Sequence, residues 1–145
     1  MESADQVPTI YVRINTLRAS EENCLAKIEK EGIVVEKVPI LQYTYRITES
    51  HKPLVRTQSF RQGLFYIQDK ASCLAAEVAN PKADETVLDI CAAPGAKTTY
   101  MAQLMQNKGV IYSVDYSKRR MNVWKNEVAR MGVEVAVPII ADVCN

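Results

Sequence analysis

The run Val87-Leu-Asp-Ile-Cys-Ala-Ala-Pro-Gly-Ala-Lys-Thr98 decides the fold of the second half of this 145-residue sequence. Its apolar, β-branched first residues predict a strand over residues 86–90. The small residues Ala92, Ala93 and Gly95 then allow a ligand to approach the backbone, and a helix begins directly after them. Because a helix N-terminus offers free N–H groups and a partial positive charge, the run predicts a site for an anionic group.

Lys97 stands in the first turn of that predicted helix, where the helix dipole disfavours a cation. This local inconsistency favours a contact between Lys97 and an anion or a carboxylate. The alternative is a lysine exposed on the surface, and the residues themselves favour neither interpretation.

Two common nucleotide-binding motifs do not fit the run. A phosphate-binding loop requires the pattern G-x-x-x-x-G-K-[ST], but Ala96 stands directly before Lys97. A dinucleotide site requires G-x-G-x-x-G, and Gly95 alone leaves too little room for a pyrophosphate. The remaining candidate is a nucleoside cofactor with a carboxylate instead of a diphosphate, and we expect S-adenosylmethionine.

Two aspartates follow the next predicted strands. Asp115 comes after a strand at 110–114, 20 residues beyond Gly95, and Asp142 comes after a strand at 135–141. The carboxyl ends of parallel strands lie at one edge of a sheet, where ligands bind. We expect Asp115 to accept hydrogen bonds from both ribose hydroxyls and Asp142 to meet the adenine amino group. The alternative for each is a turn-forming aspartate at the end of a strand.

The second half of the sequence alternates between strand and helix, which is typical of a parallel sheet. The predicted elements are strands at 86–90, 110–114 and 135–141 and helices at 96–107 and 117–131. Pro138 cannot donate to a strand ladder, so the last strand should lie at an edge. This agrees with the order 3-2-1 in the first half of a doubly wound, Rossmann-like α/β sheet.

Residues 1–59 are expected to form a small α+β unit that precedes this sheet. Alternating, β-branched patterns predict strands at 9–14 and 33–38. Between them Ser20 is a suitable N-cap for a helix, and Gly32 is a suitable stop. The second predicted domain, 60–145, begins with a strand at 63–68 and with a helix from Asp69 to residue 79, which Asn80-Pro81 ends.

Residues 44–61 carry four basic residues against one acidic residue, Glu49, and we expect irregular strands or a linker there. A solvated basic connector is one interpretation, and a surface that contacts RNA phosphates is the other. The basic residues are Arg46, Lys52, Arg56 and Arg61.

Composition excludes several other classes of protein. Apolar residues make up 48% and charged residues 24%, with a net charge of +1, as in an average soluble domain. No run is long and apolar enough to cross a membrane, and the acidic residues 1–5 do not begin a signal peptide. Four widely separated cysteines and a single histidine, His51, do not provide the usual spacing of a zinc site. We expect a protein of the reducing cytoplasm.

The run from Leu88 to Thr98 resembles the cofactor loop of the Nol/Nop/Sun family of RNA cytosine-C5 methyltransferases. Gly63, Tyr66-Ile-Gln-Asp69, Ser72 and Arg13-Ile-Asn15 resemble its other signatures, although the family more often has glycine where Ala96 stands. The resemblance implies a class I methyltransferase sheet, in which Cys91, Ala92, Ala93, Pro94, Gly95, Ala96 and Lys97 hold the methionine part of S-adenosylmethionine. It also implies Asp115 on the ribose, Asp142 near the adenine, and an N-terminal unit that helps to hold RNA. Arg120 matches a family arginine, which we interpret as structural.

The chemistry of this family needs residues that the 145-residue chain does not contain. Methylation of cytosine C5 requires a thiolate that adds at C6, and the family carries its cysteines in Pro-Cys and Thr-Cys settings. For Cys91 we expect a packing role in preference to a contact with the cofactor. Cys144 is not in a Pro-Cys or Thr-Cys setting, so we do not expect it to be a nucleophile. Cys24 and Cys73 are expected in the core. We therefore assign no catalytic residue and expect the N-terminal portion of a methyltransferase that is inactive alone.

Two alternatives to this portion of an enzyme remain open. One is a non-catalytic module that binds RNA or senses the cofactor, and the other is a methyltransferase that acts on a small molecule or protein. The expected truncation of the methyltransferase sheet has a physical consequence. The strand at 86–90 lacks its second neighbour, which predicts an exposed sheet edge and self-association.

Overall fold

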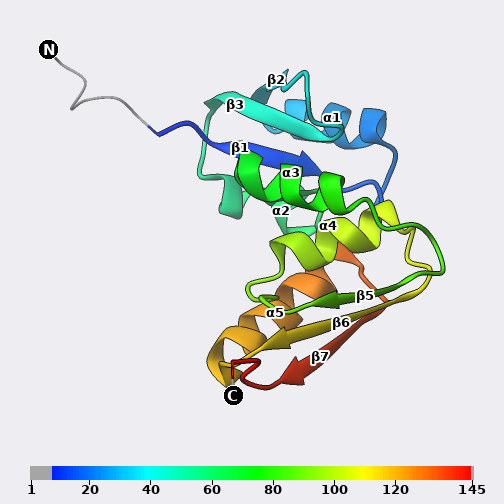
Figure 1. Ribbon diagram of the computed structural model, residues 1–145. Coiled ribbons are helices and arrows are strands. Elements are labelled where there is room, and N and C mark those ends of the chain that lie inside the picture. Colours follow the sequence, from blue (N-terminus) through cyan, green and yellow to red (C-terminus); the bar gives the residue numbers. More distant parts are fainter. Residues whose placement is uncertain (1–7, 145) are drawn as a thin grey trace, which may run out of the picture.

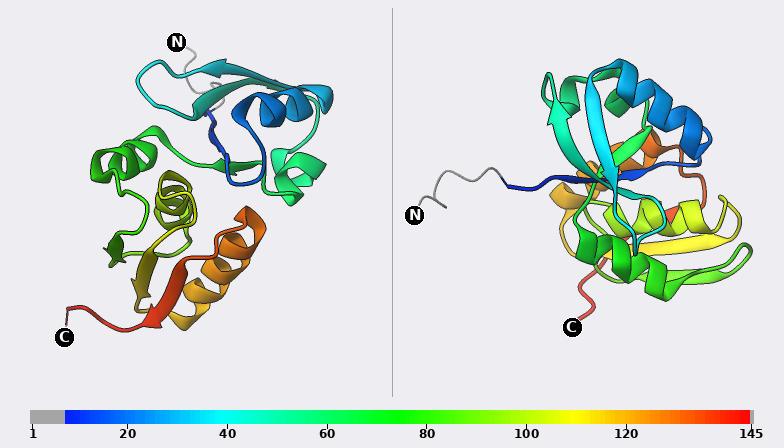
Figure 2. Two further views of the ribbon diagram at one scale, coloured as in Figure 1. Left: turned by 90° about the vertical axis from the view of Figure 1, so that its right-hand side faces the viewer. Right: turned by 90° about the horizontal axis from the view of Figure 1, so that it is seen from above.

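The computed structural model describes residues 8–144, so the acidic residues 1–5 lie outside the described part of the chain. It contains a four-stranded antiparallel sheet and a three-stranded parallel sheet. Helices fill the space between the two sheets (Figure 1). Two further views show the same arrangement from other sides (Figure 2).

The first sheet has the strand order β2-β3-β1-β4. Its strands are β1 (Tyr11–Ile14), β2 (Ile33–Lys37), β3 (Thr44–Ser50) and β4 (Phe65–Ile67), and helix α1 (Glu21–Lys30) joins the first two. Ser20 caps α1 by accepting from the N–H of Asn23 at 3.1 Å, as predicted. Cys24 and Ile28 turn into the core of this unit, while Gly32 ends the helix with φ +82°.

The basic stretch 44–61 is more regular than its composition suggested. Of our two alternatives for Thr44–Ser50, the irregular strand is correct and the linker is wrong. Strand β3 pairs with β1 on one side and with β2 on the other, and the register with β2 shifts between Val34 and Val35. A short 3₁₀ turn (Leu54–Arg56) and helix α2 (Gln58–Arg61) follow β3. Thr44 and Tyr45 at the start of β3 are buried, whereas Thr48 and Glu49 near its end are exposed. A charged strand can therefore belong to this antiparallel sheet, which is partly exposed to solvent.

The second sheet confirms the predicted parallel order. Strands β5 (Thr86–Asp89), β6 (Val110–Asp115) and β7 (Ala136–Ile140) lie in the order β5-β6-β7, with Pro138 on an edge strand. Helices α4 (Ala96–Leu104) and α5 (Lys118–Met131) connect them. Both helices lie on the side of the sheet that faces the first unit (Figure 1).

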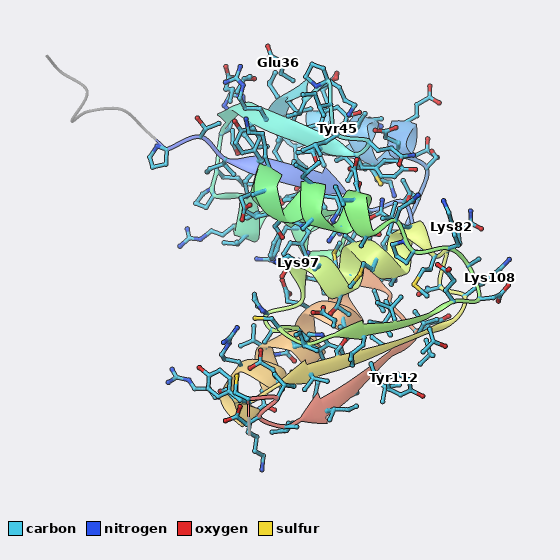
Figure 3. The ribbon with its side chains drawn as sticks, in the orientation of Figure 1. Glu36, Tyr45, Lys82, Lys97, Lys108 and Tyr112 are labelled. Atoms are coloured by element: carbon cyan, nitrogen blue, oxygen red, sulfur yellow. The ribbon has the colours of Figure 1, made fainter. Side chains whose placement is uncertain are left out.

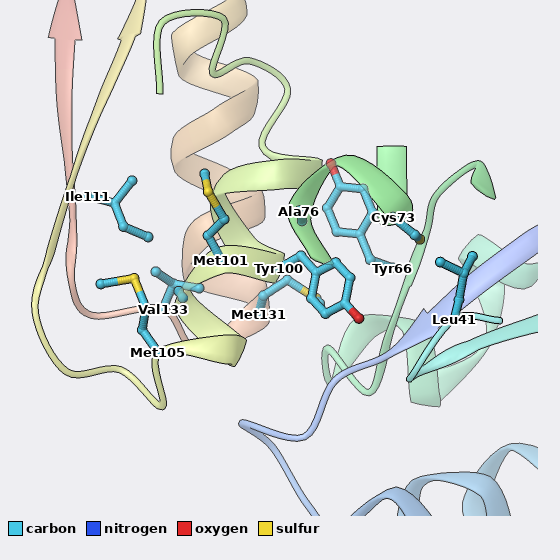
Figure 4. Packing of buried hydrophobic residues seen from close by; sticks show 11 residues of the cluster. Leu41, Tyr66, Cys73, Ala76, Tyr100, Met101, Met105, Ile111, Met131 and Val133 are labelled. Carbon is cyan, nitrogen blue, oxygen red and sulfur yellow. The ribbon is translucent and has the colours of Figure 1, made fainter. Parts of the chain in front are cut away.

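A methionine-rich core joins the parallel sheet to its helices. Met101, Met105 and Met131 pack with Ile111 of β6 and with Val133 (Figure 4). Helix α3 (Lys70–Ala79), which Asp69 caps through the N–H of Ser72 at 2.8 Å, adds Cys73 and Ala76 to this core. Leu74 and Val78 of α3 lie on its solvent side.

The opposite face of the parallel sheet is bare among the described residues. Leu88, Tyr112 and Val137 form one row across the three strands, and their exposed fractions are 64%, 40% and 40%. Figure 3 shows Tyr112 on this sheet. Parallel sheets normally have both faces covered, so this row is an unusual apolar surface.

The division into domains 1–59 and 60–145 stays a prediction. Strand β4 lies after residue 60, yet it pairs with β1 in the first sheet. The hydrogen bonds therefore carry the first sheet as far as Ile67, just before helix α3.

Candidate functional site

The loop after β5 is tied to the neighbouring strand β6. The N–H of Ala92 donates to the carbonyl of Val114 at 3.1 Å, and the side chains of Ala92 and Ala93 are buried. Gly95 has φ +120°, a conformation that residues with a side chain rarely adopt. Gly95 is also the N-cap of α4, and no side chain caps this helix. The helix therefore presents the N–H groups of its first turn to a ligand.

A series of buried hydrogen bonds connects the end of β5 with helices α4 and α5 and holds this loop in place. The Thr98 hydroxyl donates to the Asp89 carboxylate at 2.7 Å, and the indole N–H of Trp124 donates to the Thr98 hydroxyl at 3.2 Å. Asp89 also accepts from the N–H of Cys91 at 3.3 Å. Because Trp124 is the single tryptophan of the chain, its fluorescence reports on this loop.

Asp115 lies where the sequence places it, but its carboxylate is already engaged. Its two oxygens accept from the N–H groups of Ala93 and Ser117, both at 3.2 Å. Arg120 approaches to 3.5 Å, and the exposed fraction of Asp115 is 3%. A carboxylate has about four lone-pair positions, so Asp115 keeps acceptor capacity for hydroxyl groups.

The third strand brings Asp142 to the same edge. The N–H of Ala141 donates to the backbone oxygen of Asp115 at 3.1 Å. Asp142 itself is exposed and accepts from the N–H of Cys144 at 2.9 Å. The structure thus brings the loop at 91–95, Asp115 and Asp142 together at the carboxyl ends of the three strands.

Lys97 lies exposed in the first turn of α4 (Figure 3), and its side chain has no hydrogen-bond or ion-pair partner among residues 8–144. It lines a pocket of about 460 Å³ between the two units. Tyr66 of β4, Gln68 directly after β4 and Ser72 of α3 line one side of this pocket, while Ala96 and Glu127 line it from α4 and α5.

The cysteines divide into two groups. Cys24 and Cys73 are buried as predicted, and burial raises the pKa of both thiols. Cys91 is exposed, so our preference for a packing role was wrong. The small residues that fill the loop are Ala92 and Ala93 instead.

The predicted RNA-contacting residues differ in their surroundings. Arg46 forms an ion pair with Glu36 at 2.8 Å, and Lys52 lies 3.9 Å from Glu31. Arg56 and Arg61 are exposed. Within the described part of the chain, neither side chain has a hydrogen-bond or ion-pair partner.

Sequence reasoning identified three further residues by resemblance but did not predict their contacts around the site. Arg120, which we interpreted as structural, donates to the carbonyl of Ala93 at 2.7 Å and faces Asp115. Arg13 and Asn15 are fully buried and reach across to the second unit. Besides the resemblance at Arg13-Ile-Asn15, the charged residue within the otherwise apolar strand Tyr11–Ile14 was a signal for such a contact.

No helix among residues 8–144 is long and apolar enough to cross a membrane. The described residues also contain no group of three or more His, Cys, Asp or Glu side chains placed to hold a metal ion.

In comparisons with known proteins, the family model and two relatives that match this chain are all described as ribosomal RNA methyltransferases. Residues 76–145 match the family model "16S rRNA methyltransferase RsmB/F". The chain is 36% identical over 128 residues to the probable ribosomal RNA small subunit methyltransferase B of Bacillus subtilis, covering 88% of this chain and 28% of that protein. It is 36% identical over 126 residues to the 28S rRNA (cytosine-C(5))-methyltransferase of Drosophila melanogaster, covering 87% of this chain and 27% of that protein.

A solved structure agrees in fold. A methyltransferase homolog protein from Pyrococcus horikoshii superposes with a TM-score of 0.88 at 32% identity, covering 96% of this chain and 45% of that chain. The chain spans less than a third of the length of the two curated relatives.

Proposed function

The chain belongs to the Nol/Nop/Sun family of methyltransferases, and we propose that it is the cofactor-binding and RNA-contacting portion of an RNA cytosine-C5 methyltransferase. The observation that carries this proposal is the convergence of three strand ends. The loop at 91–95, Asp115 and Asp142 meet at one edge of a sheet with the Rossmann-like order of class I methyltransferases.

The residues at this edge fit S-adenosylmethionine. The uncapped first turn of α4, with Lys97 beside it, suits a carboxylate. Asp115 retains acceptor capacity for ribose hydroxyls, and Asp142 is exposed at the neighbouring strand end. We assign the residues from Cys91 to Lys97 to the methionine part, Asp115 to the ribose and Asp142 to the adenine. When bound, the cofactor supplies an electrophilic methyl group.

The chain itself supplies no thiolate for attack on cytosine C6. It contains no Pro-Cys or Thr-Cys pair, the settings in which the family carries its cysteines, and its two exposed cysteines are Cys91 and Cys144. We propose that these 145 residues alone transfer no methyl group. Incorporation of a labelled methyl group into ribosomal or transfer RNA by the isolated chain would overturn this part of the proposal.

Titration calorimetry with S-adenosylmethionine tests the cofactor site. Asp115→Asn is expected to weaken binding about 10- to 100-fold, because hydrogen bonds to a charged group contribute roughly 1.5 to 3 kcal/mol. Glu134→Gln is the matched control, since Glu134 is exposed just before β7, at the end opposite to the site. No binding at millimolar cofactor, or equal affinity of the Asp115→Asn variant and the wild type, would exclude the assignment.

We also propose that the basic residues of the first unit contact RNA phosphates. Because Arg46 and Lys52 already face carboxylates, the exposed Arg56 and Arg61 should contribute more. The double change of Arg56 and Arg61 to alanine is expected to weaken RNA binding about 10-fold at low salt and to reduce its salt dependence, because fewer counterions are released when phosphate contacts are lost.

The matched control for this experiment is the double change of Arg46 and Lys52 to alanine, which removes the same charge. Fluorescence anisotropy with a labelled ribosomal RNA fragment at several salt concentrations measures both variants. Equal binding by wild type and both variants would reject the RNA surface, whereas retained RNA binding without cofactor binding would favour a non-catalytic RNA-binding module.

Two further assignments belong to this proposal. Four cysteines without disulfides fit a reducing compartment, and we place the protein in the cytoplasm. We also propose that the bare face of the parallel sheet associates with a second copy of the chain.

A further inference from the structure

Arg13 is a fully buried arginine whose hydrogen bonds all go to neutral oxygens. Its guanidinium donates to the side-chain oxygens of Gln68 at 2.8 Å and Gln103 at 2.9 Å. It also donates to the hydroxyl of Thr99 at 2.7 Å and to the backbone oxygen of Ala96 at 3.1 Å. No carboxylate is among these partners, and a buried charge without one is rare in proteins.

Two aromatic rings complete its surroundings. The guanidinium carbon lies 4.7 Å from the ring centre of Tyr100 and 5.3 Å from that of Tyr66. Burial lowers the pKa of Arg13 to about 10, so the side chain still carries its charge at neutral pH. A positive charge is therefore kept in the interior by hydrogen bonds and ring faces alone.

The contacts of Arg13 concentrate on the start of helix α4. Ala96 and Thr99 belong to its first turn, and Gln103 lies one turn further along. Arg13 belongs to β1 of the first sheet, so a side chain of one unit holds the helix whose N-terminus forms the candidate site of the other. Gly95, at the N-cap, has no side chain to fix this turn.

Arg13 also determines the orientation of Gln68. Because the Gln68 oxygen accepts from Arg13, its amide nitrogen faces the Ser72 hydroxyl, to which it donates at 3.0 Å. Gln68 and Ser72 line the pocket beside Lys97. Arg13 thus contacts the first turn of α4 directly and also orients a side chain in the pocket beside that turn.

We propose that Arg13 is a positioning residue for the cofactor loop. Its hydrogen bonds hold the first turn of α4 in place. Its charge adds to the positive potential at the N-terminus of that helix, where a carboxylate would bind. This inference rests on the proposed function for its ligand, but the ordering of the loop can be measured without any ligand.

Arg13→Lys keeps the charge and loses the planar fork of donors, whereas Arg13→Met loses both. Hydrogen–deuterium exchange of the ligand-free chain is expected to rise about 10-fold for amides at 95–99 in both variants, with the amides of β2 and β3 unchanged. The matched control is Arg18→Met, because Arg18 also links the two units but donates to Ala129 and Arg130 at the far end of α5.

Binding of two probes then separates charge from geometry. Affinity for S-adenosylmethionine is expected to fall about 10-fold in the Arg13→Lys variant and further in the Arg13→Met variant. Affinity for 5′-methylthioadenosine, which lacks the carboxylate, is expected to change less than about threefold. Its ribose and adenine are assigned to Asp115 and Asp142, and neither of these residues is among the hydrogen-bond partners of Arg13.

Wild-type exchange at 95–99 in both Arg13 variants, or an equal rise in Arg18→Met, would overturn the positioning role. If the wild type binds neither probe, the proposed function fails while the exchange measurement still decides the role of Arg13. If Arg13→Met does not fold, Thr99→Val removes one acceptor of the guanidinium and should give an intermediate rise in exchange.

Discussion

Asn15→Leu is expected to destabilise the chain by roughly 3 kcal/mol or more, a large part of the 5 to 15 kcal/mol typical of a domain. The Asn15 amide donates to the backbone oxygens of Gly63 and Met131, both at 2.8 Å, and accepts from the N–H of Leu17 at 3.1 Å. Leucine has the same branched side-chain skeleton but is larger and leaves these buried groups without partners. The oxygen of Met131 also lies at the end of α5, where the helix has no internal donor for it.

Urea denaturation measures this effect, with Trp124 fluorescence and circular dichroism as independent probes. Asn23→Leu is the matched control, because Asn23 is exposed on α1 and the same change there should stay within about 0.5 kcal/mol. A free energy of unfolding for Asn15→Leu within about 1 kcal/mol of the wild type would contradict the prediction.

The structure explains why Arg13-Ile-Asn15 forms a recognisable signature. Ile14 points into the core of the first unit, while its two polar neighbours reach the second unit. The sequence could identify the strand, since alternation is a local property. It could not show where the polar side chains end, because their partners in the second unit lie 83 to 116 residues further along the chain.

Local signals predicted most of the elements. Ser20 caps the helix for which it was proposed, and Asp69 and Ser117 cap the helices that were predicted to begin at them, because an N-cap depends on only three following residues. At 44–50 the sequence left an irregular strand and a solvated connector open, because the charges of the stretch suit a connector. The structure shows the strand, since pairing with β1 and β2 provides partners for the backbone.

The candidate site was predictable in position but not in detail. Strand order and motif placed the loop, Asp115 and Asp142 at one edge. The contacts of Asp115 with Ala93 and Arg120 depend on how the loop folds back, which no spacing encodes. The same holds for Cys91, which the turn leaves exposed.

The exposed apolar face of the parallel sheet is expected to make the chain self-associate strongly. The wild-type chain is expected to self-associate, because Leu88, Tyr112 and Val137 form an exposed apolar row on a kind of sheet that usually has both faces covered. The outer edge of β5 adds free backbone groups, since among residues 8–144 this strand pairs with β6 alone. Both features favour contact with a second copy of the same surface.

Changing both Leu88 and Tyr112 to lysine should weaken this association about 10-fold or more, because the interface between the two copies would then have to bury unpaired charges. The fold should tolerate both changes, since both side chains already reach solvent. The double change of Leu74 and Val78 to lysine is the matched control, because these apolar residues are exposed on α3 instead. Sedimentation velocity over a range of concentrations measures the association. A wild-type chain that stays monomeric at the highest concentration, or equal weakening by both double variants, would show that the row on the sheet is not the contact surface.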